Sequence, residues 1–274
     1  MIDQKGRKPE YAPYYADGKT PEEAFGRLCR IVTILRGLCP WDRVQTHESL
    51  RKCMIEEAYE AVDAVDRQDY ENLREELGDV LLQAVFNAEL ASEEGRFDIT
   101  AVVNDECDKM IRRHPHIFAL EEAKSVDKAL EKWENVKGKE HGTQTASQRL
   151  RGVPKALPAL TRSEKIQKRA AEVGFDWPDI SGALQKVSEE LEEFKAAYQE
   201  SDRIGMEEEL GDLFFSAVNV ARFAKLDPEE ALKAATDKFT DRFCRLEDSA
   251  RAEGRELAGM TLEEMDALWD KIKG

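Results

Sequence analysis

The sequence is poor in basic residues relative to acidic ones. Its 41 lysines and arginines stand against 57 aspartates and glutamates, which gives a formal net charge of −16. Broad contact with a nucleic-acid backbone requires clustered positive charge that displaces counterions, so we expect no stable nucleic-acid binding. A small polyphosphate is not excluded, because a bound cation can reverse the sign of the local charge.

Long hydrophobic runs are also missing. No apolar stretch approaches the roughly 20 residues that span a bilayer, and the first eighteen residues are polar, without the apolar region of a signal peptide. The five cysteines form no Cys-x-x-Cys pair. We therefore expect a cytoplasmic protein with no membrane partner.

Three further absences narrow the fold and the chemistry. There is no glycine-rich phosphate loop, which excludes a P-loop enzyme, and no Glu-x-x-His on the acidic segments, which argues against a di-iron carboxylate bundle. Alternation with a period of two residues is almost lacking, so sheet content should be negligible. The expected fold class is all-α.

The length and the turn signals divide the chain into two domains. At 274 residues it can form two modest domains, each with its own core. We expect an N-terminal arm over 1–19, a first domain over 20–137, a polar linker over 138–150 and a second domain over 151–274.

An acidic pattern occurs twice, 133 residues apart. Each copy has Glu-Glu-x-x-Glu followed by Glu-x-x-Asp. The residues are Glu56, Glu57, Glu60, Glu76 and Asp79 in the first copy, and Glu189, Glu190, Glu193, Glu209 and Asp212 in the second. A repeat at a fixed offset indicates a duplicated structural unit.

Both acidic segments have helical periodicity, and their carboxylates flank apolar positions. In the first copy, Met54, Ala58, Ala61, Val62 and Val65 form a stripe that we expect to face the core. Carboxylates that converge beside such a stripe resist ionisation, because desolvation and mutual repulsion both oppose it. A divalent cation resolves this, and all-oxygen ligands suit Mg²⁺, with Mn²⁺ as a substitute. A solvated acidic surface is the alternative.

A helical basic pair follows each acidic pattern. The pairs are Lys109 with Arg113 and Lys238 with Arg242, each four residues apart. Acids that hold magnesium, with cations close by, are suited to gripping a polyphosphate. Structural salt bridges on the helix surface explain the same pairs equally well.

These residues together resemble the MazG family of nucleoside triphosphate pyrophosphohydrolases, within the all-α NTP pyrophosphatase superfamily, in its tandem-domain form. The likeness extends over about residues 20 to 273. Besides the acidic pattern, its supporting segments are Cys39-Pro40-Trp41-Asp42 with Gln45-Thr46-His47, Arg112-Arg113-His114-Pro115-His116, Val173-Gly174-Phe175-Asp176-Trp177 and Lys238-Phe239 with Arg242-Phe243.

The resemblance implies Mg²⁺-dependent hydrolysis of nucleoside triphosphates to the monophosphate and pyrophosphate, by a homodimer, in nucleotide-pool housekeeping or stress. Its metal ligands would be Glu190, Glu193, Glu209 and Asp212, with Glu189 outside them as a water-orienting group. Lys238 and Arg242 would contact phosphate, and Trp269 and Lys273 would help to hold the nucleotide.

The two copies differ at one informative position. Asn219 lies two helical turns beyond Asp212 on the same face and could reach the nucleotide, whereas its counterpart in the first copy is Phe86. We therefore expect the second domain to be the main catalytic one. The first-copy acids, with Lys109 and Arg113, form a second candidate site.

Two other functions fit the same residues. One is a narrower pyrophosphohydrolase for a dUTP-like or phosphoribosyl-nucleotide substrate, although the tandem copies favour MazG. The other is a regulator that binds nucleotide or protein through an acidic helical bundle without turnover. Pyrophosphate release from a panel of nucleotides distinguishes the three.

Overall fold

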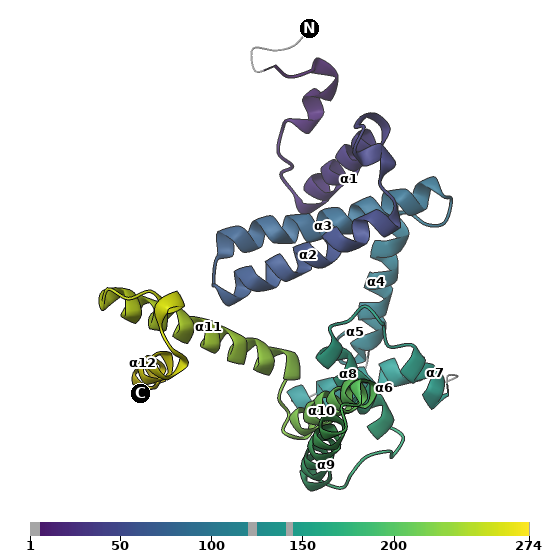
Figure 1. Cartoon of the computed structure of the whole chain (residues 1–274). Helices are drawn as coiled ribbons and strands as arrows, with labels where there is room; N and C mark the ends of the chain where they lie inside the picture. The colour runs from purple at the N-terminus through teal and green to yellow at the C-terminus, as the bar shows by residue number, and fades with distance from the viewer. Residues whose placement is uncertain (1–5, 120–124, 141–144, 274) are drawn as a thin grey trace. The chain divides into compact units, whose positions relative to one another are not determined.

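A computed structural model describes residues 6–119, 125–140 and 145–273 of the chain. Within these residues the secondary structure is entirely helical, which confirms the all-α fold (Figure 1). The chain divides into two compact units, Met1–Lys139 and Glu140–Gly274, and each is described by itself.

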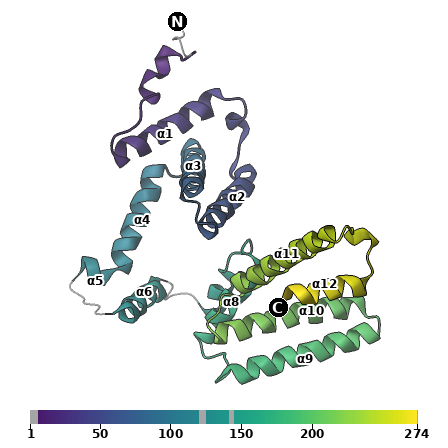
Figure 2. The ribbon, with the colours of Figure 1, turned by 90° about the vertical axis from the view of Figure 1, so that its left-hand side faces the viewer.

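The first unit is built around an antiparallel pair, α2 and α3, with α1 packed against α3 (Figure 2). Thr20 and Thr46 cap α1 and α2 as their sequence positions predict, since each hydroxyl accepts a backbone N–H three residues on. The elements are η1 (Pro9–Tyr14), α1 (Pro21–Leu38), η2 (Asp42–Val44), α2 (His47–Asp66), α3 (Tyr70–Glu93), α4 (Ile99–Arg113), α5 (Pro115–Phe118) and α6 (Val126–Glu140).

The second unit repeats the pair as α9 and α10, with α8 packed against α10 and a hairpin of α11 and α12 following. Its elements are α7 (Ala146–Arg151), α8 (Ala159–Ala171), α9 (Ile180–Gln199), α10 (Arg203–Phe223), α11 (Pro228–Ala252), η3 (Leu257–Gly259) and α12 (Leu262–Lys273). The segment 138–150, expected as a polar linker, therefore contains the end of α6 and most of α7, and the arm over 1–19 contains η1.

The turn between the two acidic helices has the same backbone conformation in both units. Gln68 and Ser201, 133 residues apart, both have positive φ, at 56° and 57°. The next residue in each copy, Asp69 and Asp202, donates its N–H to the carbonyl five positions back in the preceding helix, and its side chain caps the following helix. The duplication inferred from the acids thus extends to the backbone.

The core of the first unit lies where α1, α2 and α3 meet. Val32, Leu50, Val85, Phe86 and Leu90 are its buried members. In the second unit, one apolar cluster joins α11 to α12 through Leu246, Ala250, Met260 and Leu268.

The prediction that the apolar stripe of α2 faces the core is wrong. Met54, Val62 and Val65 are 43%, 46% and 55% exposed. The residues that approach α3 are instead Leu50 and Ala64, which are buried, together with the half-buried Glu57. The acid motif itself thus lies along the inter-helix seam, and an apolar face remains at the surface.

None of the described helices combines the length and the apolar composition needed to cross a bilayer.

Candidate functional site

The second-unit acids form an acid cluster between α9 and α10, comprising Glu189, Glu190, Glu193, Glu209 and Asp212. Carboxylate oxygens of Glu190, Glu209 and Asp212 lie within 4.8 Å of one another, and so do those of Glu189, Glu190 and Glu193. Helical spacing places the acids of each helix on the side that faces the other helix. Glu190, which belongs to both groups, is the shared member.

Glu190 is only 2% exposed, and Lys186 contacts its carboxylate from one turn earlier on α9. The same ammonium donates to Glu189 at 2.8 Å. The Lys186 hydrogen bond lowers the pKa of Glu190, against the burial that would raise it. Sequence reasoning missed Lys186, although its (i, i+3) and (i, i+4) spacing from the two glutamates was a readable signal.

Glu209 has the opposite character. Desolvation, repulsion from Glu193 and contact with the Glu190 carboxylate raise its pKa. A carboxyl group surrounded by other carboxyl groups is an electrostatic conflict that either a shared proton or a bound cation relieves.

The first unit has a smaller group. Oxygens of Glu57, Glu60 and Glu76 lie within 4.8 Å of one another. Burial raises the pKa of Glu57, and repulsion from Asp79 adds to it, so Asp79 also lies close by. Glu56 instead pairs with Lys52 at 2.9 Å on the surface.

The acid cluster of the second unit fits a hard divalent cation. It offers only oxygen donors, it contains a buried carboxylate, and Glu209 is held in a field that favours added positive charge. These properties suit Mg²⁺ or Mn²⁺ and do not suit a metal that requires nitrogen or sulfur ligands.

The predicted nucleotide-binding residues near the C-terminus gather on the α11–α12 hairpin. Lys238 and Arg242 make no ion pair with the described residues, and the neighbouring Phe239 packs against Trp269 with ring centroids 5.3 Å apart. Lys273 pairs with Asp270 at 3.3 Å. The hairpin thus brings four predicted residues to one element, but no contact within the described chain joins them to the acid cluster.

The basic pair of the first unit has local partners. Lys109 contacts Glu106 on its own helix, and the Arg113 guanidinium lies 5.3 Å above the ring of Trp133. Neither contact involves the first-unit acids.

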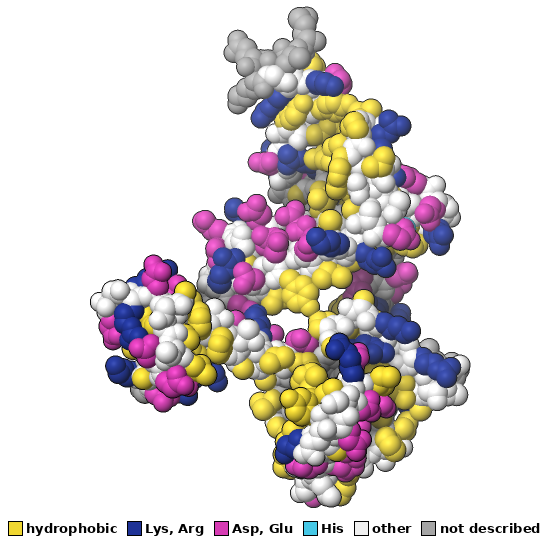
Figure 3. Space-filling model, viewed as in Figure 1, with side chains coloured by type: hydrophobic (Ala, Val, Ile, Leu, Met, Phe, Trp, Pro, Cys, Tyr) yellow, Lys and Arg dark blue, Asp and Glu magenta, His cyan; other side chains and the backbone are white. Residues whose placement is uncertain are grey.

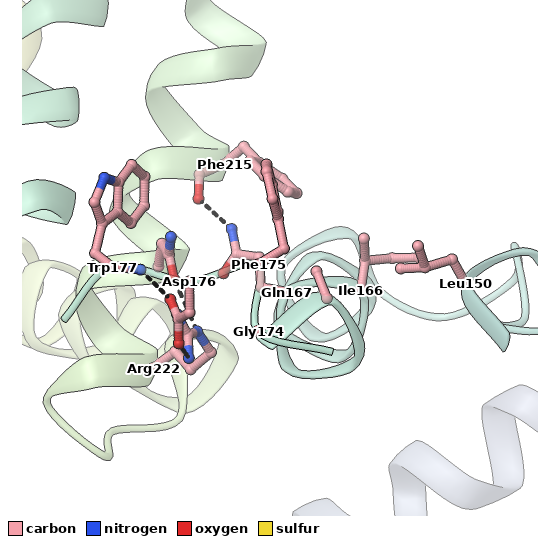
Figure 4. A pocket seen from close by; sticks show the side chains of 11 residues that line it. Leu150, Ile166, Gln167, Gly174, Phe175, Asp176, Trp177, Phe215 and Arg222 are labelled. Carbon is pink, nitrogen blue, oxygen red and sulfur yellow. Dashed lines mark hydrogen bonds and ion pairs between the residues drawn. The ribbon is translucent and has the colours of Figure 1, made fainter. Parts of the chain in front are cut away.

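Asn219 lies in a cavity of about 510 Å³ in the second unit. It is 8% exposed, and its Oδ1 accepts a hydrogen bond from Arg222 at 2.8 Å. Figure 4 shows this cavity with Phe175, Trp177 and Gln167 at its walls. The counterpart Phe86 is instead 4% exposed and belongs to the first-unit core.

Comparison with known proteins places both acidic segments in one family. The MazG nucleotide pyrophosphohydrolase domain matches residues 45–118 and again 180–244. The chain is 44% identical to the nucleoside triphosphate pyrophosphohydrolase/pyrophosphatase MazG of Thermotoga maritima, covering 91% of this chain and 96% of that protein.

Two further relatives have similar identity. The nucleoside triphosphate pyrophosphohydrolase of Escherichia coli K12 is 42% identical, over 91% of this chain and 98% of its own length. The uncharacterized protein YabN of Bacillus subtilis is 45% identical over 96% of this chain and 54% of its own length. The chain therefore belongs to the MazG nucleotide pyrophosphohydrolase family, and it carries the family's domain twice.

Proposed function

We propose that this protein is a magnesium-dependent enzyme that hydrolyses nucleoside triphosphates to the monophosphate and pyrophosphate, with a role in control of the nucleotide pool. The observation that carries the proposal is that carboxylate oxygens of Glu190, on α9, and of Glu209 and Asp212, on α10, lie within 4.8 Å of one another. The names of the relatives from Thermotoga maritima and Escherichia coli support the same substrate class.

The reaction requires that the negatively charged triphosphate bind beside the carboxylates of the acid cluster. Water adds to a phosphorus of the α–β bridge, the bridging P–O bond breaks, and a proton is released. When bound, magnesium would supply Lewis acidity, offsetting the charge on the phosphate oxygens. Glu190, Glu193, Glu209 and Asp212 would hold it.

Residues beside the cluster would act on the water and the phosphates. Glu189 lies next to the ligand set and would accept a hydrogen bond from the attacking water, with Lys186 fixing its orientation at 2.8 Å. Lys238 and Arg242, on the α11–α12 hairpin, would bind phosphate oxygens, while Trp269 and Lys273 would complete the nucleotide contact.

We also propose that the chain forms a homodimer. The outer sides of the acidic helix pairs expose large apolar residues, among them Tyr59 and Val62 on α2 and Phe214 on α10, which are 46–56% exposed. Hydrophobic side chains reach the surface of both units (Figure 3). Two antiparallel pairs that join on such faces make a four-helix bundle, and a two-fold axis would bury identical patches.

The decisive experiment measures pyrophosphate release from a panel of ribo- and deoxyribonucleoside triphosphates, with magnesium and with chelator. We expect release from several members of the panel, and only with the metal. Activity confined to a dUTP-like or phosphoribosyl substrate would replace the proposal with the narrower enzyme. Nucleotide binding without any release would indicate a regulator.

A further inference from the structure

The cavity beside Asn219 has the size and lining of a small-molecule site. Its volume of about 510 Å³ lies within the range of roughly 300–1,000 Å³ typical of ligand pockets. Apolar side chains form most of its walls, including Leu150, Ile166, Phe175 and Trp177. Helices α7, α8 and α10 and the loop between α8 and α9 contribute these side chains.

An ion pair fixes the loop that carries the aromatic residues. Arg222 on α10 donates to both carboxylate oxygens of Asp176, at 2.9 and 2.5 Å, and the two side chains are 12% and 24% exposed. Figure 4 shows these bonds beside the cavity. A bidentate, half-buried pair of this kind holds Phe175 and Trp177, the neighbours of Asp176, in place.

A glycine sets the position of the indole. A Cβ at Gly182, near the start of α9, would lie 2.4 Å from Cδ1 of Trp177, so the ring rests directly on the α9 backbone. On the other side of Asp176, Phe175 lines the cavity although the residue is 83% exposed. The Phe175 ring is therefore not packed in the core, and it is open to a ligand.

One residue of the cavity wall has a buried acceptor without a donor. Gln167 is 6% exposed, and its Nε2 donates to the carbonyl of Phe215 at 2.7 Å. Because a carbonyl only accepts, this bond fixes the amide, and the buried Oε1 then has no hydrogen-bond partner. An unpaired buried acceptor costs free energy unless a ligand supplies an N–H or O–H.

Asn219 supplies the complementary group. Its Oδ1 is taken by Arg222, whereas its Nδ2 donates to none of the described residues. The residues that line the cavity thus carry one unpaired acceptor, on Gln167, one donor, on Asn219, and aromatic rings.

The cavity continues the line of the acid cluster along α10. Asp212 and Asn219 are seven residues apart, which places them on the same side of the helix and about 10 Å from each other along its axis. A nucleoside triphosphate is long enough to span that separation with its phosphates at Asp212.

We propose that this cavity binds the nucleobase of the substrate, with the base against Phe175 and Trp177 and its polar edge on Gln167 and Asn219. The inference rests on the proposed function for the phosphate end of the ligand. A flat heterocycle with both N–H donors and acceptors satisfies all of these groups at once.

The first unit supports the assignment by contrast. Where the second unit has Asn219 and Arg222, the first has Phe86 and Glu89 at the same 133-residue offset. Phe86 fills its position with core packing, and Glu89 cannot form the ion pair that Arg222 makes with Asp176. We accordingly assign base binding to the second unit alone.

The test compares ligands with and without a base. Dissociation constants are measured calorimetrically, with magnesium, for a non-hydrolysable nucleoside triphosphate analogue and for inorganic tripolyphosphate. We expect Phe175→Ala to weaken binding of the analogue about fivefold or more, since one stacked base contributes roughly 1–3 kcal/mol. Gln167→Leu should also weaken it, because a hydrogen bond to the base is lost. Both variants should bind tripolyphosphate with unchanged affinity.

Two matched variants serve as controls. Phe175→Tyr keeps an aromatic ring and should retain affinity for the analogue. Gln83→Leu removes a comparable buried, unpaired amide oxygen from the first unit, and should change neither dissociation constant. Thermal melts verify that each variant is folded.

Three outcomes would overturn the base site. In the first, folded Phe175→Ala binds the analogue with unchanged affinity. In the second, the affinities for the analogue and for tripolyphosphate fall equally. In the third, a variant shifts the monomer–dimer equilibrium without changing the affinity for the nucleotide. If wild type binds the analogue through Phe175 but releases no pyrophosphate from any triphosphate, the base site stands and the proposed function falls.

Discussion

Lys186 contacts Glu190, the least exposed carboxylate of the acid cluster, across one turn of α9. The contact lowers the pKa of Glu190, and the hydrogen bonds of Lys186 to Glu189 and then to Glu190 raise the pKa of the lysine. A buried carboxylate is therefore neutralised by a residue of its own helix, and a metal ion that binds Glu190 would compete with this lysine.

Removing that lysine should destabilise the metal-free protein. Lys186→Met leaves Glu190 buried without its cation, and an uncompensated buried charge is strongly unfavourable. We expect a lower midpoint in urea with chelator present, and a partial recovery with magnesium. Lys52→Met is the matched control, because its (i, i+4) partner Glu56 is half exposed and surface pairs contribute little. Equal effects of the two variants would contradict the role of Lys186.

Catalysis should depend on the ligands that α10 supplies. Glu209→Gln or Asp212→Asn replaces a charged oxygen with a neutral amide, and we expect turnover to fall about a hundredfold or more. Glu192→Gln makes the same chemical change on α9 outside the acid cluster, where Glu192 pairs with Lys195 at 2.7 Å. It should retain wild-type turnover. Normal turnover in a folded Asp212→Asn variant would exclude it as a ligand.

The two units should contribute unequally to activity. Asp79→Asn is expected to lower pyrophosphate release much less than Asp212→Asn, because Phe86 fills the position of Asn219 with apolar core. The comparison uses steady-state rates of the two single variants on one nucleotide. A loss from Asp79→Asn that equals or exceeds the other would place catalysis in the first unit.

The pKa of Glu209 predicts a pH trend for the metal-free protein. The folded state raises it above the ordinary value of 4.5, so the group contributes stability below 4.5 that is lost as the pH rises through the raised pKa. The free energy of unfolding of wild type, relative to Glu209→Gln, should therefore fall from pH 4.5 toward neutrality. Urea titrations in chelator measure it, and a flat difference would contradict the electrostatic conflict.

Asp176 provides a control, because its stability contribution should change with pH in the direction opposite to that of Glu209. Its hydrogen bonds from Arg222 lower its pKa below the ordinary value of 3.8. The stability of wild type relative to Asp176→Asn should therefore be present above pH 3.8 and be lost as the pH falls through the lowered value.

The sequence predicted those features of the site that depend on local spacing. The acids of one helix share a face because they recur every three or four residues, and the caps at Thr20 and Thr46 follow from side chains that bond the nearest free N–H groups.

Features that depend on tertiary packing could not be predicted in this way. Met54 and Val62 read as core because they are apolar and helically spaced, yet they lie on the face that α3 does not cover. The cavity requires Gln167 on α8, Asp176 in a loop and Arg222 on α10, and no sequence spacing connects them. Lys186 differs from these residues, because its contacts with Glu189 and Glu190 follow from a spacing of three and four residues on one helix.

Magnesium should stabilise the folded protein through the second unit. A ligand that binds only the folded state adds about 2.7 kcal/mol when it is present at a hundredfold excess over its dissociation constant. We expect a magnesium-dependent rise in the melting temperature of wild type. Since two units can unfold separately, the rise can be confined to one of two transitions.

Asp212→Asn distinguishes a metal site from a structural role. The change removes one of the repelling carboxylates, so in chelator the variant should be as stable as wild type or more stable, as expected where function costs stability. The same change weakens the site, so the gain from magnesium should shrink. Glu192→Gln should keep the full gain, because Glu192 lies outside the acid cluster. If wild type does not respond to magnesium, or the variant melts well below wild type in chelator, Asp212 is structural and the cluster is not a strained metal site.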